Sequence, residues 1–110
     1  MEVYTTRTYE RAICKALKRE ERKAMEAAIV AEPKAAPVIP GTGGIRKLRW
    51  SASGRGKRGG IRAVYFYHSG PHALYLLAAY AKSRREDLTP ADKKAWVRLV
   101  RAIKKEDRNT

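Results

Sequence analysis

The sequence predicts an α+β fold in which helices pack against a small, mostly antiparallel β-sheet. Three observations support this prediction. Helical periodicity dominates both ends of the chain, three strand-like runs follow one another in its middle, and glycine- or proline-rich segments separate those runs. The expected order is β-α-α-β-β-β-α. The 110 residues are enough for one domain, spanning residues 1–110, and no internal repeat is visible.

A short β-prone segment, residues 2–5, is expected to lead into a helix. Thr8 is the expected N-cap of that helix, because its hydroxyl can accept a hydrogen bond from a free backbone N–H group. Apolar residues follow at helical spacing, namely Tyr9, Ile13, Ala16 and Leu17. The single cysteine, Cys14, falls within this pattern and is expected to pack, and one cysteine excludes an internal disulfide.

A second helix is expected from Arg19 to Ala31. Glu20 and Glu21 suit its start, because carboxylates oppose the positive end of the helix dipole. Its expected apolar stripe consists of Ala24, Met25, Ala28 and Ile29. The step from Glu32 to Pro33 ends the helix, because the residue before proline is pushed out of the helical conformation.

The middle of the chain is expected to form a long loop and three strands. Residues 33–44 are rich in proline and glycine, which is typical of a connecting loop. The first strand, 45–51, alternates cations with apolar residues, the second, 61–68, is rich in β-branched and aromatic residues, and the third, 73–81, is almost wholly apolar. A glycine-rich basic loop, 53–60, joins the first two strands.

The last element carries a clear helix-start signal. Thr89 supplies a capping hydroxyl, Pro90 occupies the first helical position, and Asp92 adds an acid to the first turn. The expected apolar stripe consists of Trp96, Leu99, Val100 and Ile103. Cations in the last turns complement the negative end of the dipole, namely Lys104, Lys105 and Arg108.

The charge of the chain is large and localised. Twenty-five Lys and Arg residues face eleven Asp and Glu residues, for a formal net charge of +14. No acidic residue lies between Glu32 and Glu86. Because solvated surfaces usually mix signs, this block indicates a polyanionic partner, and nucleic acid is favoured over a membrane surface or an acidic protein. The longest apolar run is shorter than the roughly 20 residues that cross a bilayer, and no signal peptide is evident, so a cytoplasmic location is expected.

The sequence resembles the RelE/ParE superfamily of toxins from bacterial toxin–antitoxin systems. The resemblance rests on the element order and on three motifs, Gly41-Thr-Gly-Gly-Ile-Arg-Lys-Leu-Arg, Gly54-Arg-Gly-Lys-Arg-Gly-Gly-Ile-Arg and Tyr80-Ala-Lys82. The Gly-Lys-Arg-Gly-Gly loop places it closest to the HigB-like branch. The resemblance covers nearly the whole chain and implies a RelE-like fold, a twisted antiparallel sheet with two N-terminal helices on one face and a C-terminal helix near an edge.

This resemblance implies a ribosome-dependent mRNA endonuclease, or mRNA interferase, which inhibits translation without a metal or another cofactor. Members that cleave RNA cut mRNA in the A site of the 30S subunit, where the 2′-hydroxyl of the RNA attacks the adjacent phosphate. Carried over by motif, the catalytic cations are Lys47, Arg49, Arg62 and Lys82. The chain departs from the family at Ser83, where a second cation is common, and it has no tyrosine after Tyr80, so Tyr80 or Trp96 would have to stack on the target base.

The residues themselves suit this chemistry. Lys47 and Arg49 are two apart on a strand, so they are expected to project to one face, with the intervening apolar side chains on the other. Charge builds on the phosphate oxygens during the attack, and one fixed donor there typically lowers the barrier by about 3–4 kcal/mol. The two-pronged guanidinium suits Arg49 and Arg62 to this role. A lysine among cations loses its proton more readily, so Lys47 or Lys82 is the candidate base.

Further residues are expected to bind the RNA, namely Arg46, Arg55, Lys57, Arg58, Tyr80, Arg84 and Arg85. Residues 54–59 also satisfy G-x-G-x-x-G, but a dinucleotide site needs a helix after the motif, and a strand is expected there. His68 and His72 flank a turn and offer no convincing catalytic pair, and no metal site is expected.

Two other functions remain open at this point. One is a ParE-like inhibitor of DNA gyrase on the same fold, which the four cations disfavour because that branch generally lacks them. The other is a non-catalytic basic RNA-binding protein, which the charge alone would allow. The resemblance implies a helix-turn-helix antitoxin as partner, the ribosome and mRNA as targets, operator DNA bound only through the antitoxin, and no membrane partner.

Overall fold

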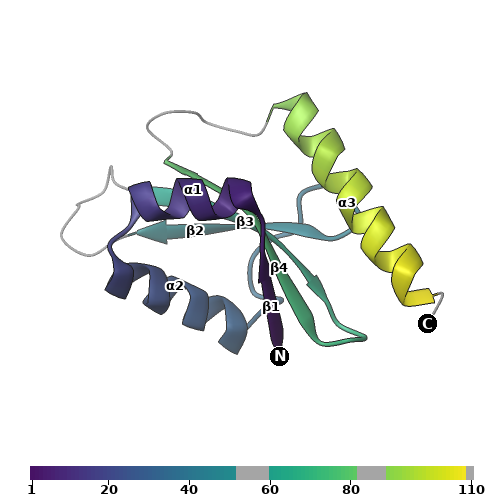
Figure 1. The fold of residues 1–110 in the computed structure, drawn as a ribbon, viewed down its shortest axis with the longest axis horizontal. Helices are drawn as coiled ribbons and strands as arrows, with labels where there is room; N and C mark the ends of the chain where they lie inside the picture. Colours follow the sequence, from purple (N-terminus) through teal and green to yellow (C-terminus); the bar gives the residue numbers. More distant parts are fainter. Residues whose placement is uncertain (52–59, 82–88, 109–110) are drawn as a thin grey trace.

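The computed structural model describes residues 1–51, 60–81 and 89–108 (Figure 1). In chain order its elements are β1 (Glu2–Thr5), α1 (Arg7–Ala16), α2 (Arg19–Ala31), β2 (Ile45–Ser51), β3 (Gly60–His68), β4 (Ala73–Ala81) and α3 (Pro90–Arg108). The predicted α+β class and the order β-α-α-β-β-β-α are therefore confirmed. None of the helices in the described segments combines the length and the apolar character that crossing a membrane would require.

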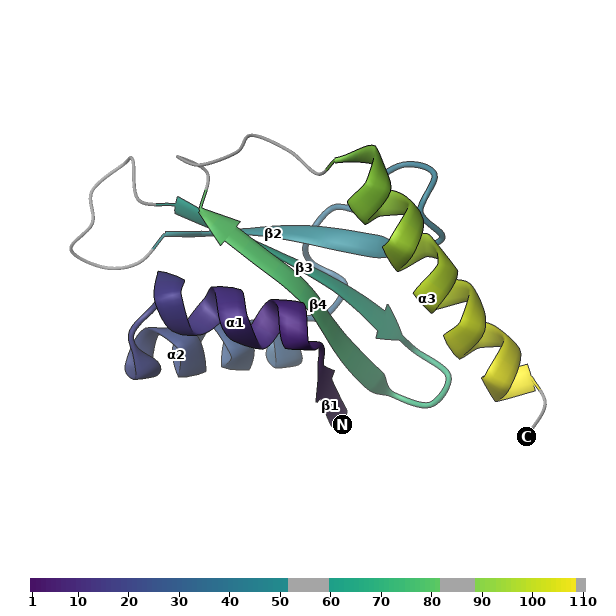
Figure 2. The ribbon, with the colours of Figure 1, turned by 45° about the horizontal axis from the view of Figure 1, so that its top comes forward.

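The four strands form one sheet in the order β1-β4-β3-β2. β2, β3 and β4 pair antiparallel, as expected, whereas β1 joins the edge of the sheet parallel to β4. Figure 2 shows the twist of the sheet, with β2 and β4 crossing at an angle. The register between β3 and β4 shifts between Val64 and Tyr65, so Leu77 of β4 has no direct partner on β3. Leu77 and the next residue, Ala78, both belong to the apolar cluster that contains Trp96 and Val100 of α3.

α1 and α2 cover one face of the sheet. Tyr9, Ile13, Met25 and Ile29 are buried against it, in a cluster with Ile61, Ala63, Tyr65, Leu74 and Leu76 of β3 and β4. The predicted stripe of α2 is half correct, because Ala24 and Ala28 are exposed. The helix touches the core only through the i, i+4 pair Met25 and Ile29, and this narrow contact leaves the small neighbouring side chains in solvent.

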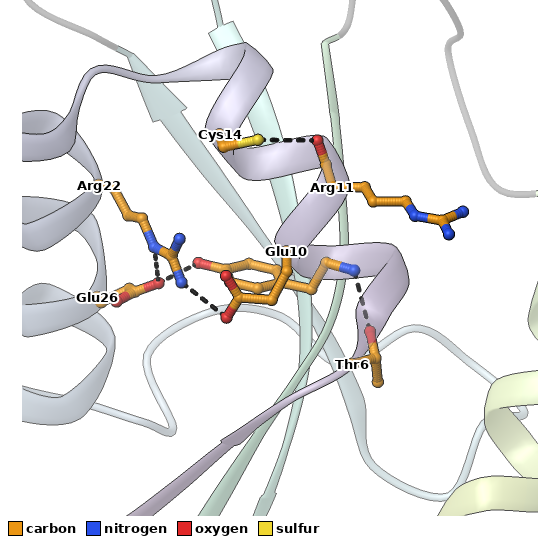
Figure 3. Close-up of polar contacts among 7 residues, drawn as sticks. Thr6, Glu10, Arg11, Cys14, Arg22 and Glu26 are labelled. Carbon is orange, nitrogen blue, oxygen red and sulfur yellow. Dashed lines mark hydrogen bonds and ion pairs between the residues drawn. The ribbon is translucent and has the colours of Figure 1, made fainter.

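Two local predictions for α1 are wrong. Its N-cap is Thr6 rather than Thr8, because β1 ends at Thr5 and the helix starts one residue after Thr6. The Tyr9 N–H donates to the Thr6 hydroxyl oxygen at 3.0 Å, and that hydroxyl donates to the Leu77 carbonyl at 2.6 Å, which also ties the helix start to β4. Cys14 is exposed, because Ile13 rather than Cys14 faces the sheet. The Cys14 thiol lies 3.5 Å from the Arg11 carbonyl oxygen (Figure 3).

A polar cluster joins α1 to α2 (Figure 3). Arg22 donates to Glu10 and to Glu26, each at 2.9 Å, and the Tyr9 hydroxyl donates to Glu26 at 2.5 Å. Burial raises the pKa of Tyr9, and the hydrogen bond to Glu26 raises it further. Hydrogen bonds from Arg22 and Thr5 lower the pKa of Glu10. The guanidinium of Arg22 therefore forms ion pairs with two carboxylates, those of Glu10 and Glu26.

α3 packs on part of the opposite sheet face. The predicted start is confirmed, since the Asp92 N–H donates to the Thr89 hydroxyl oxygen at 3.1 Å. Trp96 and Val100 are buried and Ile103 is partly buried, whereas Leu99 is 37% exposed. The prediction for Leu99 is wrong, because the helix turns Val97 rather than Leu99 toward the core.

Candidate nucleic-acid interface

Three predicted site residues form a row across neighbouring strands. In the sheet register, Arg49 of β2 pairs with Arg62 of β3, and Arg62 pairs with Tyr80 of β4. Directly paired residues project to the same face of a sheet. This face is the one opposite α1 and α2, because the next residues along β2, Leu48 and Trp50, pack into the cluster beneath those helices. Arg49, Arg62 and Tyr80 therefore lie side by side on this face, and we call them the row.

Lys47 extends the row along β2, two residues before Arg49 and on the same face. An open pocket of about 760 Å³ lies here, lined by Lys47, Leu48 and Arg49 of β2, by Arg62 of β3 and by the loop segment Ala35 to Pro37. The Lys47 N–H donates to the Pro37 carbonyl at 3.1 Å, so the loop forms one wall along the edge of β2. Three of the four predicted catalytic cations therefore line one pocket.

The burial of Arg62 is the most informative property of this pocket. Arg62 is only 6% exposed, whereas Arg49 is exposed. Both ion pairs in the described part of the chain involve Arg22, so no carboxylate there neutralises Arg62. A buried charge is unfavourable unless it is paired, and like charges directly opposite one another in a sheet repel. A bound phosphate would relieve both effects.

β3 begins beside the Arg62 guanidinium. A Cβ atom at Gly60 would lie 3.5 Å from Arg62 Nη1 and 3.8 Å from the Trp50 carbonyl, which are ordinary van der Waals distances. A small side chain at position 60 would therefore fit next to the guanidinium.

The loop that walls the pocket is an ordered structure, which sequence reasoning missed. Thr42 is 1% exposed, and its hydroxyl donates to the Ile39 carbonyl at 2.6 Å and accepts from the Ile45 N–H at 3.1 Å. The Ile39 N–H donates to the Ile45 carbonyl at 2.7 Å, which closes the loop onto the start of β2. Gly44 has a φ of +118°, a backbone conformation that residues with a side chain rarely adopt. It also lies against the Phe66 ring. The Thr-Gly-Gly run is the signal that could have predicted this.

The structure does not bring Arg46 to the row. Its guanidinium donates to the Lys34 and Ala36 carbonyls, at 2.9 and 2.6 Å, on the face that carries Leu48 and Trp50. This position follows from strand alternation, because Arg46 directly precedes Lys47 and neighbouring side chains of a strand point to opposite faces of the sheet. Arg46 therefore holds the loop against β2 in this structure.

The two candidate stacking rings lie in the core. Tyr80 and Trp96 are each 9% exposed and share the apolar cluster under α3. Their rings pack against protein rather than facing solvent. The other predicted residues, Arg55, Lys57, Arg58, Lys82, Arg84 and Arg85, lie outside the described residues.

The histidines lie at the other end of the sheet from the row. His68 pairs with Ala73 at the end of β3, six residues beyond Arg62, and His72 Nδ1 lies 2.8 Å from the Tyr67 hydroxyl. In the segments that the structure describes, no group of three His, Cys, Asp or Glu side chains could hold a metal ion.

The chain as a whole is similar to known proteins. Residues 1–109 match the family described as "RelE toxin of RelE / RelB toxin-antitoxin system". The intact E. coli RelBE toxin–antitoxin complex contains a chain that is similar to this one with a TM-score of 0.54 at 15% identity, covering 72% of this chain and 93% of that chain. An arginine-to-alanine double mutant of E. coli toxin RelE in the free state gives a TM-score of 0.52 at 15% identity, covering 77% of this chain and 86% of that chain.

Proposed function

This chain belongs to the RelE family of toxins, and we propose that it is a ribosome-dependent mRNA endonuclease that arrests translation. The observation that carries the proposal is the burial of Arg62, a residue only 6% exposed that pairs with Arg49 across the strands and meets no carboxylate among the described residues. A structural arginine in the core would be expected to have an acidic partner, as Arg22 does. A receptor for phosphate would not.

The row suits cleavage by the RNA itself. The 2′-oxygen attacks the adjacent phosphorus, the bond to the 5′-oxygen breaks, and the products are a 2′,3′-cyclic phosphate and a 5′-hydroxyl. Negative charge grows on the non-bridging oxygens as this happens, and Arg62 and Arg49 would donate to those oxygens. Because the burial of Arg62 fixes its guanidinium in advance, little reorganisation is needed at the moment of reaction.

A proton must leave the 2′-hydroxyl and another must reach the departing 5′-oxygen. Lys47 lines the pocket together with Arg49 and Arg62, so it is a candidate to take the first proton. The proton on the 5′-oxygen would come from water or from the lysine that accepted the first one. Lys82 is the second candidate for this role and lies outside the described residues. The proposed reaction requires no cofactor, because both the nucleophile and the leaving group belong to the RNA.

The same family membership suggests the partners. A toxin of this kind must be held inactive, and we expect a cognate helix-turn-helix antitoxin that binds it and brings the pair to operator DNA. The name of the E. coli RelBE complex supports an antitoxin partner. The target would be mRNA in the A site of the 30S subunit, which places the site of action in the cytoplasm.

The experiment is to induce the wild type and the Arg62→Ala and Lys47→Ala variants in a bacterial host and to map mRNA 5′ ends by primer extension. Arg19→Ala is the matched control, because it removes an exposed cation from α2. We expect new ends inside translated codons for the wild type and the control, none for Arg62→Ala or Lys47→Ala, and none when translation is blocked. Growth arrest with intact mRNA and broken DNA would instead establish a gyrase inhibitor, and unaffected growth would indicate an inactive copy of the toxin or a non-catalytic RNA-binding protein.

A further inference from the structure

α3 carries a second basic surface, separate from the row. An open pocket of about 490 Å³ lies between this helix and the loop before β2, and four cations line it, namely Lys93, Lys94, Arg98 and Arg101. Lys94, Arg98 and Arg101 are exposed. Both ion pairs in the described segments belong to Arg22, so no carboxylate there neutralises these cations.

Three of these cations belong to a straight stripe along the helix, which Lys105 continues. Lys94, Arg98, Arg101 and Lys105 follow the spacing i, i+4, i+7 and i+11, which keeps them on one face, opposite the buried Trp96 and Val100. We call these four residues the α3 stripe. It runs for roughly 16 Å, with successive cations about 5 Å apart along the axis. The acidic residues of the helix fall outside this spacing, namely Asp92, Glu106 and Asp107.

One loop connects the α3 stripe to the row. Its early part, Ala35 to Pro37, walls the pocket that holds Arg62, and its later part, at Gly41, borders the pocket on α3. Figure 2 shows this loop passing beside α3 before it enters β2. The Lys104 amine donates to the Gly43 carbonyl at 2.8 Å, which fixes the helix to the same loop. The two basic surfaces are therefore held in a fixed relation.

We propose that the α3 stripe binds the phosphate backbone of a double-helical RNA segment, while the row binds the single strand that is cut. This inference rests on the proposed function. On the ribosome the duplex would be a double-helical segment of ribosomal RNA next to the mRNA. Binding of this duplex would orient the pocket that holds Arg62 toward the mRNA strand.

The composition of the α3 pocket favours duplex RNA over other polyanions. Among the described residues its lining adds Gly41, Pro90 and Val97 to the four cations and contains no aromatic residue. Single-stranded nucleic acid is typically held by stacking on aromatic rings, whereas duplex RNA is recognised through its shape and its phosphates. A protein partner would favour an apolar or aromatic centre, which this pocket lacks.

The test is a binding titration of the full chain against a 16-base-pair RNA duplex and against a single-stranded RNA of the same length, over a range of salt. All chains carry Arg62→Ala to prevent cleavage. The test variant adds Lys94→Gln, Arg98→Gln and Arg101→Gln. The matched control adds Arg11→Gln, Lys15→Gln and Lys23→Gln, three exposed cations on α1 and α2, so both variants lose the same charge.

We expect the α3 variant to bind the duplex at least about tenfold more weakly than the control, with a salt slope lower by roughly one unit per lost phosphate contact. Binding of the single strand should change equally in the two variants. Equal duplex binding by the two variants would overturn the proposal, and so would an α3 variant that loses duplex and single-strand binding to the same extent. Neither result would affect the proposed function, which the mapped mRNA ends test separately.

Discussion

Arg22 and Arg62 are both largely withdrawn from solvent, but their surroundings are opposite. The side chain of Arg22 is 26% exposed and donates to Glu10 and Glu26, each at 2.9 Å. Arg62 is 6% exposed, and its register partners are Arg49 and Tyr80. One guanidinium completes an internal charge network between two helices. The other concentrates positive charge on an open sheet face.

The difference separates stability from function. A buried pair is costly to break, because removing one partner leaves an uncompensated charge. Arg62 has no carboxylate partner among the described residues and so already carries that cost, and its removal should not weaken the fold. Arg62 should therefore matter for the reaction and Arg22 for the fold.

The largest expected effect is the loss of cleavage in Arg62→Met. Methionine keeps an unbranched stem and removes the charge, so the phosphate loses a fixed donor, and the cleavage rate should fall by roughly 10²–10³-fold. The melting temperature should stay level or rise, because an unfavourable buried charge has been removed. Rate assays and thermal melts on the same preparation measure both quantities. A variant that cleaves normally but melts early would reverse the assignment.

Arg22→Met is the counterpart and should destabilise the protein. The change leaves Glu10 and Glu26 without their common donor beside the Tyr9 hydroxyl, and the free energy of unfolding should fall by about 1–2 kcal/mol. Denaturant titration measures this loss. The cleavage rate of the folded variant should match the wild type, and a rate that drops as in Arg62→Met would remove the distinction between the two arginines.

Sequence reasoning was strongest where a pattern fixes a geometry. Strand alternation placed Lys47 and Arg49 on one face, and the signal at Thr89 and Pro90 placed the start of α3. It failed where a tertiary contact decides between neighbours. Thr6 rather than Thr8 caps α1, because β1 determines where the helix can begin. Arg46 donates to the loop carbonyls, because its side chain points to the opposite sheet face from that of Lys47.

The burial of Arg62 could not be predicted either. It depends on the pairing of β3 with both neighbouring strands, a long-range property that no local pattern contains. The assignment to the HigB-like branch remains a prediction, because its loop lies outside the described residues.

Arg49→Ala changes the exposed arginine of the row and should have a smaller effect on cleavage than Arg62→Met. Arg49 is exposed, so water screens its charge and less is lost when it is removed. We expect the cleavage rate to fall by roughly tenfold, the scale of one charge-assisted hydrogen bond. Rate assays with Arg19→Ala as control measure it. An effect larger than that of Arg62→Met would make the exposed residue the main phosphate donor.

The smallest effect is the pH dependence of the Arg22 cluster. Because hydrogen bonds from Arg22 and Thr5 lower the pKa of Glu10 in the folded state, the carboxylate stabilises the protein above its ordinary pKa of about 4.3. That stabilisation is lost as the pH falls through the lower folded value. Glu10 is partly exposed, so its contribution should stay below about 1 kcal/mol. Glu10→Gln should therefore melt earlier than the wild type at neutral pH and together with it in acid, and a constant gap in thermal melts would contradict this.

The most direct test of the central claim is the thermal stability of the wild type, Arg62→Met and Arg22→Met in phosphate and in chloride at equal ionic strength. If Arg62 is a phosphate receptor, phosphate should raise the melting temperature of the wild type and of Arg22→Met, because a ligand that binds only the folded state stabilises it. The increment should be clearly smaller in Arg62→Met. An equal increment in all three proteins would contradict the account, since it would place the bound phosphate elsewhere on this basic surface.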